Sequence, residues 1–468
     1  MSRSQRRRFL VSLGSGMAFV AMARGAAAAA ASRQRPNILF ILADDLGFAD
    51  LSCYGRRDYQ TPVLDELAAE GVRFTQAYSN SPVCSATRVA LATGRYQYRL
   101  ATGLEEPINA RTTGDASGLS PAHPTLPSML RTAGYRTALI GKWHLGALPG
   151  YSPLKSGYDQ FFGIAGGAAD YVSHTAPPRD TPDLYDGERL TEANGYLTDV
   201  LSDKAVEYVR DARRHDAPFL LSLHYTAPHW PWQAPGDTPT PKDRALFHFE
   251  GGSLDVYARM VRSMDTGIGR VLAALRATKL DRSTLVVFTS DNGGERFSDN
   301  WPLSGQKLDL LEGGIRVPQI VRWKGELPAG SVTDQVMVSM DWVPTLLTLG
   351  RGAADAGYPL DGIDLSALLQ GARRVERRTL HWRMNYRNQA ATRSGDWKYL
   401  RIGSSEFLFD LATDARERAN RRKDEPERFA ALKSQWESWN AQMLPLPTAP
   451  ARYFNGSDLA GYYDTPPQ

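Results

Sequence analysis

Apolar and polar positions along this chain form blocks that are typical of strands followed by helices. The first block, 38–42, is a continuous apolar run, as expected for a strand that is buried on both faces of a sheet. Thr61 and Pro62 begin a helix that ends near Gly71, and a strand is predicted over 72–78. This order predicts an α/β fold, in which helices cover a mostly parallel sheet on both faces.

The same alternation continues through the middle of the chain. Further helices are predicted over 125–133, 196–214 and 254–277, and the strands that follow them over 135–140, 219–223 and 285–289. Two stretches rich in Gly, Pro, Ser and Thr, 109–122 and 165–188, are predicted to be long loops, which are often functional. We therefore expect one large domain over 32–370, built on a large mixed, mostly parallel sheet sandwiched by helices.

The pattern changes after Gly371, where the charged run 373–378 begins. Beyond it, short strands are predicted over 379–383, 389–393, 397–402 and 407–411, and a helix over 425–439. We expect a smaller C-terminal α+β subdomain and tail over 371–468, with an antiparallel sheet plus a helix.

Composition excludes some classes of protein. The chain has 468 residues, of which 42% are hydrophobic and 23% charged, which is ordinary for a globular protein with one large core and a smaller unit. The formal net charge is +4, but the first 31 residues hold several arginines and no acid, and the rest of the chain is nearly neutral. No basic field therefore indicates nucleic acid as a partner.

The N-terminal segment has the features of a targeting signal. The run Arg6-Arg7-Arg8-Phe9-Leu10 is followed by an apolar stretch to about Ala23 and then by an alanine-rich stretch. This predicts a twin-arginine signal peptide over 1–31, and the resemblance implies export by the twin-arginine machinery to a bacterial periplasm or the extracellular space. No other apolar run reaches the length of a membrane span, so we do not expect an integral membrane protein.

Polar groups follow the ends of two predicted strands. Asp44 and Asp45 follow the first strand, and Asp291 and Asn292 follow the strand over 285–289. Open parallel sheets bind ligands at the carboxyl ends of their strands. Carboxylates gathered there would repel one another without a cation, and hard oxygen ligands suit Ca²⁺ or Mg²⁺. For either pair alone, a helix cap or a turn would be the better interpretation.

Cys84 begins the most informative stretch, Cys84-Ser85-Ala86-Thr87-Arg88. It follows a Ser-Pro start signal and opens a short helical run that Gly94 can end. A helix N-terminus favours negative charge, and Arg88, one turn on, can point its guanidinium to the same place. The combination suits an oxyanion such as sulfate or phosphate. The alternatives are an inert buried thiol or a disulfide with Cys53, the only other cysteine.

With the Leu-x-Thr-Gly-Arg tail at 91–95, this stretch resembles the signature of the type I sulfatases, formylglycine-dependent and arylsulfatase-like enzymes of the alkaline phosphatase superfamily. The resemblance implies that a formylglycine-generating maturation enzyme converts Cys84 to formylglycine (3-oxoalanine), whose hydrate is the nucleophile. It also implies a divalent cation, Ca²⁺ with Mg²⁺ as the alternative, bound by Asp44, Asp45, Asp291, Asn292 and the modified Cys84. Ala86 stands where the family most often has Pro, which leaves the maturation system open.

Other stretches resemble the same family. The string Gly-Lys-Trp-His-Leu-Gly at 141–146 maps Lys142 and His144 onto contacts with the formylglycine and the sulfate. His229 maps onto a contact with the sulfate and the leaving group, and Lys307 onto a contact with the ester oxygen, ahead of a Glu-Gly-Gly turn. Together with Arg88 these are the predicted catalytic residues. We expect His224, Glu312 and Arg316 to be scaffold.

The resemblance implies a sulfatase that hydrolyses sulfate monoesters of a sulfated saccharide or a small aryl sulfate to an alcohol and inorganic sulfate. Two alternatives stay open: a phosphomonoester or phosphonate hydrolase of the same superfamily, and a sulfated-glycan-binding protein that is unmodified at Cys84. Four aromatic residues could stack on a sugar or could simply be packing: Tyr171, Trp230, Trp232 and Trp301.

Overall fold

A computed structural model describes residues 35–108, 117–176, 181–240, 251–369 and 377–447. The predicted signal peptide (1–31) and the predicted break at Gly371 lie outside the described residues, as do most of the loop expected at 109–122 and part of the charged run at 373–378.

A mixed eleven-stranded sheet forms the centre of the larger part of the molecule. Its strands are β1 (Asn37–Ala43), β2 (Val72–Tyr78), β3 (Arg136–Gly141), β4 (Gln160–Ile164), β7 (Leu184–Asp186), β8 (Arg189–Leu190), β9 (Phe219–His224), β10 (Thr284–Ser290), β11 (Arg316–Arg322), β12 (Ser331–Thr333) and β13 (Met337–Val338). They lie in the order β12-β2-β11-β10-β1-β9-β3-β4-β7-β8, and β13 also pairs with β2. The central strands β10, β1, β9, β3 and β4 are parallel, whereas β11 and β7 run antiparallel to their inner neighbours.

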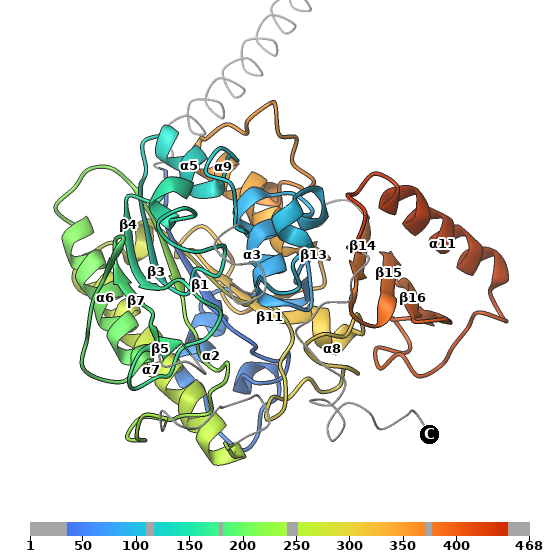
Figure 1. Cartoon of the computed structure of the whole chain (residues 1–468), viewed down its shortest axis with the longest axis horizontal. Helices are drawn as coiled ribbons and strands as arrows, with labels where there is room; N and C mark the ends of the chain where they lie inside the picture. Colours follow the sequence, from blue (N-terminus) through green and yellow to red (C-terminus); the bar gives the residue numbers. More distant parts are fainter. Residues whose placement is uncertain (1–34, 109–116, 177–180, 241–250, 370–376, 448–468) are drawn as a thin grey trace, which may run out of the picture.

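Helices cover both faces of this sheet, as predicted (Figure 1). One face is covered by α2 (Pro62–Ala69), α6 (Leu197–Ala212) and α7 (Leu254–Ala277), and the other by α3 (Cys84–Thr93), α5 (Leu126–Thr132) and α9 (Trp342–Gly350). The sequence of β1 is continuously apolar because both faces of the strand are buried. Leu39 and Ile41 pack toward α6 and α7, while Phe40 and Leu42 pack toward α3, α5 and α9. The short helices α8 (Glu312–Ile315) and α10 (Ser366–Leu369) complete this part.

The C-terminal part is a four-stranded antiparallel sheet with one helix, also as predicted, and lies at the right of Figure 1. It consists of β14 (Thr379–Met384), β15 (Gln389–Ser394), β16 (Trp397–Ile402), β17 (Ser405–Asp410) and α11 (Pro426–Asn440). Trp436 and Trp439 of α11 share an apolar cluster with Tyr78 of β2 and Ala90 of α3. The Trp382 indole donates to the Ser79 carbonyl at 2.9 Å, so the small sheet is packed directly against the larger one.

Several features differ from the sequence prediction, which gave no strand at β4 and no helix at α9. The stretch 165–188, expected to be a loop, contains β7 and the short pair β5 (Thr175–Ala176) and β6 (Thr181–Pro182), because β7 adds to the sheet beside β4. Strand β11 was not predicted: Pro318 interrupts its pattern, and the pairing with β2 shifts register at this residue. Within the described ranges, no helix is long and apolar enough to cross a membrane.

Candidate active site

The ends of β1 and β10 bring the predicted acidic cluster together. These strands pair in parallel, with Ala43 opposite Ser290, so the residues that follow them meet at one edge of the sheet. The Asp45 amide donates to Asp291 Oδ1 at 3.3 Å, and Asn292 Nδ2 donates to Asp45 Oδ1 at 2.7 Å. Two sequence-distant pairs therefore form one buried group of oxygen atoms.

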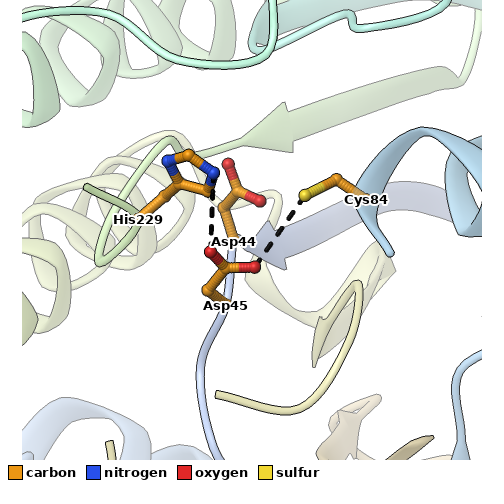
Figure 2. A group of neighbouring side chains, drawn as sticks. All are labelled: Asp44, Asp45, Cys84 and His229. Atoms are coloured by element: carbon orange, nitrogen blue, oxygen red, sulfur yellow. Dashed lines mark hydrogen bonds and ion pairs between the residues drawn. The ribbon is translucent and has the colours of Figure 1, made fainter. Parts of the chain in front are cut away.

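Cys84 is the first residue of α3 and points into this group (Figure 2). Its Sγ lies 3.8 Å from Asp45 Oδ1. The Thr87 hydroxyl fixes the approach to the helix, since it accepts from the Ser81 amide at 3.0 Å and donates to the Ser81 carbonyl at 2.9 Å. Val83, the N-cap residue, supplies no side-chain cap. The sulfur thus lies at a helix N-terminus, where an anion is stabilised.

Cys53 and Cys84 are both free, so the disulfide alternative is wrong.

The thiol of Cys84 is not activated as a nucleophile. Burial raises the pKa of the Cys84 thiol well above its usual value, although Lys142 and Lys307 act in the opposite direction. Because the thiolate is the nucleophilic form of cysteine, an unmodified Cys84 is a poor nucleophile here.

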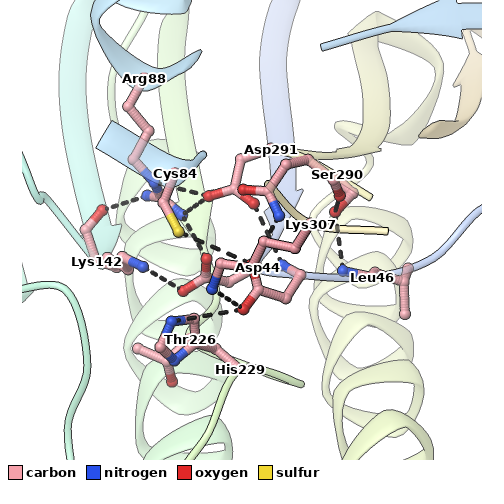
Figure 3. Close-up of polar contacts among 12 residues, drawn as sticks. Asp44, Leu46, Cys84, Arg88, Lys142, Thr226, His229, Ser290, Asp291 and Lys307 are labelled. Atoms are coloured by element: carbon pink, nitrogen blue, oxygen red, sulfur yellow. Dashed lines mark hydrogen bonds and ion pairs between the residues drawn. The ribbon is translucent and has the colours of Figure 1, made fainter. Parts of the chain in front are cut away.

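Cationic side chains contact each carboxylate of the cluster (Figure 3). Lys142 Nζ lies 2.5 Å from Asp44 Oδ2, and Lys307 Nζ lies 2.5 Å from Asp45 Oδ2. Arg88 Nε and Nη2 both donate to Asp291 Oδ2, at 3.0 and 2.9 Å. A third bond, from Arg88 Nη1 to the Lys142 carbonyl at 2.9 Å, ties α3 to the end of β3.

The pKa values of the three carboxyl groups are shifted in different directions. Burial, with Asp291 close by, raises the pKa of Asp44 to about 6, and burial raises that of Asp45 well above its usual value despite Lys307. Burial would also raise the pKa of Asp291, but Arg88 and Lys142 outweigh it and the pKa is lowered. Further positive charge at this place would favour the ionised forms of Asp44 and Asp45.

Among the four predicted oxygen ligands of the cluster, two buried oxygen atoms have no hydrogen-bond partner among the described residues: Asp44 Oδ1 and Asn292 Oδ1. Such atoms are rare in folded proteins, and a cation would satisfy both. Ligand atoms of Asp44, Asp45, Cys84 and His229 all lie within 4.8 Å of one another. The carboxylate and amide oxygens suit a hard divalent cation, whereas the sulfur of Cys84 does not; an oxygen in its place would.

The two predicted catalytic histidines make different contacts. His229 Nε2 is 3.5 Å from Asp45 Oδ2, which adds this residue to the potential metal ligands. His144 is held by a 2.9 Å contact between Nε2 and the Ile108 carbonyl, and its Nδ1 has no hydrogen-bond partner among the described residues. Burial, with help from Lys142, lowers the pKa of His144 well below its usual value. The ring is therefore neutral, with its proton on Nε2 and a lone pair on Nδ1.

Of the residues expected to be scaffold, His224 and Glu312 are buried and Arg316 is partly buried. His224 packs edge-on against Phe40, and burial lowers the pKa of His224 to about 3. Glu312 accepts a hydrogen bond from the Tyr78 hydroxyl at 2.6 Å and pairs with Lys398 at 2.9 Å. Arg316 donates to the Thr75 carbonyl at 2.7 Å.

Three of the four aromatic candidates for sugar stacking are packing residues. Tyr171, Trp230 and Trp232 are buried, and the Tyr171 hydroxyl donates to the Thr226 and His229 carbonyls, both at 2.8 Å. Tyr171 therefore supports the loop that carries His229. Trp301 alone among the four is exposed, at 60%.

Glu295 was missed by the sequence analysis. It is buried, and its Oε1 lies 3.9 Å from Lys307 Nζ. The sequence signal that could have identified Glu295 is its position directly after Asp291-Asn292-Gly293-Gly294. The Ile108 carbonyl, which orients His144, was also missed, and a backbone contact of this kind leaves no sequence signal.

Comparisons with known proteins agree on one family. The family model described as Sulfatase matches residues 36–353. N-acetylgalactosamine-6-sulfatase from Canis lupus familiaris is 33% identical over 375 residues, which cover 76% of this chain and 70% of that protein. Arylsulfatase J from Mus musculus is 34% identical over 350 residues, which cover 72% of this chain and 56% of that protein. The crystal structure of Ps i-CgsB in complex with k-i-k-neocarrahexaose has a TM-score of 0.79 at 30% identity, over 91% of this chain and 97% of that one.

Proposed function

The chain belongs to the sulfatase family and is a sulfuric ester hydrolase, and from this premise we propose that it removes sulfate from a sulfated saccharide with formylglycine derived from Cys84 as its nucleophile. The observation that carries the proposal is the position of Cys84. Its sulfur lies at the N-terminus of α3, 3.8 Å from Asp45 Oδ1. Lys142 and Lys307 contact the surrounding carboxylates.

Conversion of Cys84 to formylglycine would replace a weak nucleophile and a poor ligand with an oxygen group that suits both roles. The raised pKa of Cys84 makes it a weak nucleophile, and sulfur is a poor ligand for a hard cation. The hydrate of formylglycine supplies one hydroxyl to attack sulfur and a second whose deprotonation releases sulfate. The conversion is a two-electron oxidation, so an external formylglycine-generating enzyme would have to supply an oxidant such as molecular oxygen; the Cβ–Sγ bond of Cys84 breaks, the sulfur leaves as sulfide, and an oxygen atom takes its place on Cβ.

The cation is proposed to be Ca²⁺, with Mg²⁺ as the alternative. Asp44, Asp45, Asp291 and Asn292 would hold it, together with the oxygen of modified residue 84. When bound, it supplies positive charge that offsets the charge of the sulfate group. The Asn292 side chain donates to Asp45 in this structure, and a rotation of its amide would exchange that nitrogen for the oxygen that lacks a partner.

The remaining residues of the cluster have distinct proposed roles. Arg88 holds Asp291 ionised and in place through two bonds to one oxygen. Lys142 and Lys307 stabilise the negative charge that develops on the sulfate oxygens and the ester oxygen. Lys307 or His229 donates the proton that the leaving alcohol takes, which is general acid catalysis. His144, neutral with a free lone pair on Nδ1, accepts a proton at that atom when sulfate is released.

The saccharide class is supported by the relatives. N-acetylgalactosamine-6-sulfatase carries a saccharide in its name, and the Ps i-CgsB structure holds an oligosaccharide. We also propose export as a folded protein, on the basis of the twin-arginine pattern at 6–10. Export of the folded form would let maturation of Cys84 precede translocation.

The test is sulfate release by protein whose modification at residue 84 has been verified, measured on sulfated oligosaccharides, an aryl sulfate and the matching aryl phosphate. Cys84→Ala should lower turnover by roughly 10⁴-fold or more while the circular dichroism spectrum stays unchanged. Cys53→Ala is the matched control, because Cys53 is the other free cysteine and lies outside the cluster. Wild-type turnover by Cys84→Ala, or a preference for the phosphate ester, would reject the proposal.

A further inference from the structure

The C-terminal sheet reaches the catalytic cluster through the turn between β14 and β15. Met384, the last residue of β14, shares a small apolar cluster with Val83 and Leu308, and Tyr386 packs against it. Val83 directly precedes Cys84, and Leu308 directly follows Lys307. One turn of the small sheet therefore touches the neighbours of two catalytic residues.

Gln389, the first residue of β15, makes the polar contacts of this junction. Its side chain is buried, with an exposed fraction of 1%. Oε1 accepts from the Leu310 amide at 2.9 Å, and Nε2 donates to the Leu308 carbonyl at 2.7 Å and to the Tyr386 carbonyl at 3.1 Å. A side-chain amide is suited to this place because it offers an acceptor and two donors at once.

The segment that Gln389 holds has an unfavourable backbone. Leu308 has a φ of 78°, in the left-handed region that a bulky residue adopts only when its surroundings impose it. Neighbouring contacts act on the same segment: the Lys307 amide donates to the Gly294 carbonyl and the Leu308 amide to the Pro82 carbonyl, both at 3.0 Å. At the end of this segment Lys307 Nζ lies 2.5 Å from Asp45 Oδ2.

We propose that Gln389 is a positioning residue for Lys307. Gln389 acts through the backbone: its side chain fixes the carbonyl of Leu308 and the amide of Leu310. The strained backbone conformation that results directs Lys307 Nζ toward the cluster. This inference rests on the proposed function, in which Lys307 meets the ester oxygen. It assigns to the C-terminal sheet an indirect part in the reaction, namely the placement of one catalytic side chain.

The first test uses the dependence of rate on the leaving group. Gln389→Leu removes the donor and the acceptor at nearly constant size. On a series of aryl and alkyl sulfates, its kcat/KM should fall about 10- to 100-fold for the poorest leaving groups, which need Lys307 most, and less than about threefold for the most activated aryl sulfates. Lys307→Met should show the same pattern with a larger amplitude.

The matched control is Thr392→Val. Thr392 lies on the same strand, is fully buried, and its hydroxyl contacts His381 Nδ1 at 2.9 Å instead of the Lys307 segment. It should leave the leaving-group dependence unchanged. The proposal would be overturned if kcat/KM of Gln389→Leu fell by the same factor for every ester in the series, and by no more than kcat/KM of Thr392→Val.

A crystal structure of the Gln389→Leu variant separates this inference from the proposed function. The inference expects a changed Leu308 conformation and Lys307 Nζ displaced from Asp45; an unmoved Lys307 would refute it whatever the activity. Wild-type rates with Lys307→Met, by contrast, would refute the proposed role of Lys307. Should Gln389→Leu not fold, Gln389→Glu keeps the acceptor for Leu310, loses the donor, and is subject to both measurements.

Discussion

Charge balance decides the behaviour of individual residues in the cluster. Asp44, Asp45 and Asp291 are fully buried side by side, and burial raises the pKa of the first two. Lysine and arginine contacts compensate in part, yet Asp44 Oδ1 and Asn292 Oδ1 still lack a hydrogen-bond partner among the described residues. A bound cation would offset the buried negative charge and would satisfy both oxygen atoms.

Removal of the cation should therefore cost both activity and stability. Prolonged chelation is expected to abolish sulfate release, and Ca²⁺ or Mg²⁺ should restore it. Saturating ion should also raise the free energy of unfolding, by about 2.7 kcal/mol at a concentration 100 times Kd. Denaturant titrations with and without the ion measure this, and Asp44→Asn should reduce the response. Full activity in protein that elemental analysis finds free of divalent metal would contradict the assignment.

Glu106 provides a pH test away from the cluster's carboxylates. It is buried, its Oε2 accepts from the Asn385 amide at 2.8 Å, and burial raises its pKa from 4.5 to about 8. Below pH 4.5 the folded and unfolded states both bind the proton. Between pH 4.5 and 8 only the folded state keeps it, so the stability contribution falls as pH rises and is lost above pH 8.

Glu106→Gln should remove this dependence. Because one pKa unit corresponds to about 1.4 kcal/mol, the variant should gain at least about 1 kcal/mol relative to the wild type between pH 4 and pH 9. Denaturant unfolding at a series of pH values measures the difference. The half-exposed neighbour Glu105 is the control, and Glu105→Gln should change the pH dependence less. Parallel stability curves for Glu106→Gln and the wild type would show that folding does not raise the pKa of Glu106.

At the scale of elements, α3 is the part on which the site depends most. It carries Cys84 at its first position and Arg88 one turn later, and it ends at Gly94 in the left-handed conformation, with a φ of 69°. A Cβ on Gly94 would lie 2.7 Å from Val343 Cβ and 2.9 Å from Leu360 Cδ2. The end of the helix is thus fixed by backbone conformation and by packing against α9.

Gly94→Ala separates these two effects when compared with Gly395→Ala. Gly395 has a φ of 59° and open space around its Cβ position, so its substitution should cost about 1 kcal/mol through conformation alone. Gly94→Ala should cost about 2–4 kcal/mol, because overpacking adds to the same conformational cost. Denaturant unfolding measures both, and equal costs for the two variants would mean that α9 yields easily.

Much of this architecture was predictable because its signals are local. The apolar run of β1, the Asp44-Asp45 and Asp291-Asn292 pairs, and the Cys84 stretch each stand out in the sequence, and the parallel pairing of β1 with β10 brings the two acidic pairs together. Strand β11 was missed because Pro318 argues against a central strand, and the bulge that accommodates it depends on the partner β2. The contacts of Gln389 join segments 79 and 81 residues away, and no local pattern indicates them.

At the scale of the whole molecule, a buried charge network joins the C-terminal sheet to the larger part. Lys398 of β16 lies between Glu312 Oε1 at 2.9 Å and Glu417 Oε1 at 2.8 Å, with both its partners buried. The Tyr78 hydroxyl of β2 donates to the other oxygen of Glu312 at 2.6 Å. Loss of the lysine would leave Glu417 buried without this cation, and Glu312 would keep its contact with Arg316 at 3.5 Å.

Lys398→Ala should therefore destabilise the protein by about 3–5 kcal/mol. Lys324 is a matched control, since it also pairs with two carboxylates, at 2.9 and 3.0 Å, but is 25% exposed. Lys324→Ala should cost at most about 1 kcal/mol. Equilibrium unfolding in denaturant gives both values. Similar costs for the two lysines would contradict the view that burial makes the Lys398 network important.

The central claim is that Cys84 acts only after conversion to formylglycine. Mass spectrometry of the peptide that contains residue 84, on preparations that differ in the degree of maturation, tests it most directly when turnover is measured on the same samples. We predict a peptide in which an aldehyde oxygen replaces the thiol, with turnover proportional to its fraction and absent where the cysteine is intact. Full turnover by protein whose Cys84 is wholly an unmodified thiol would contradict the account.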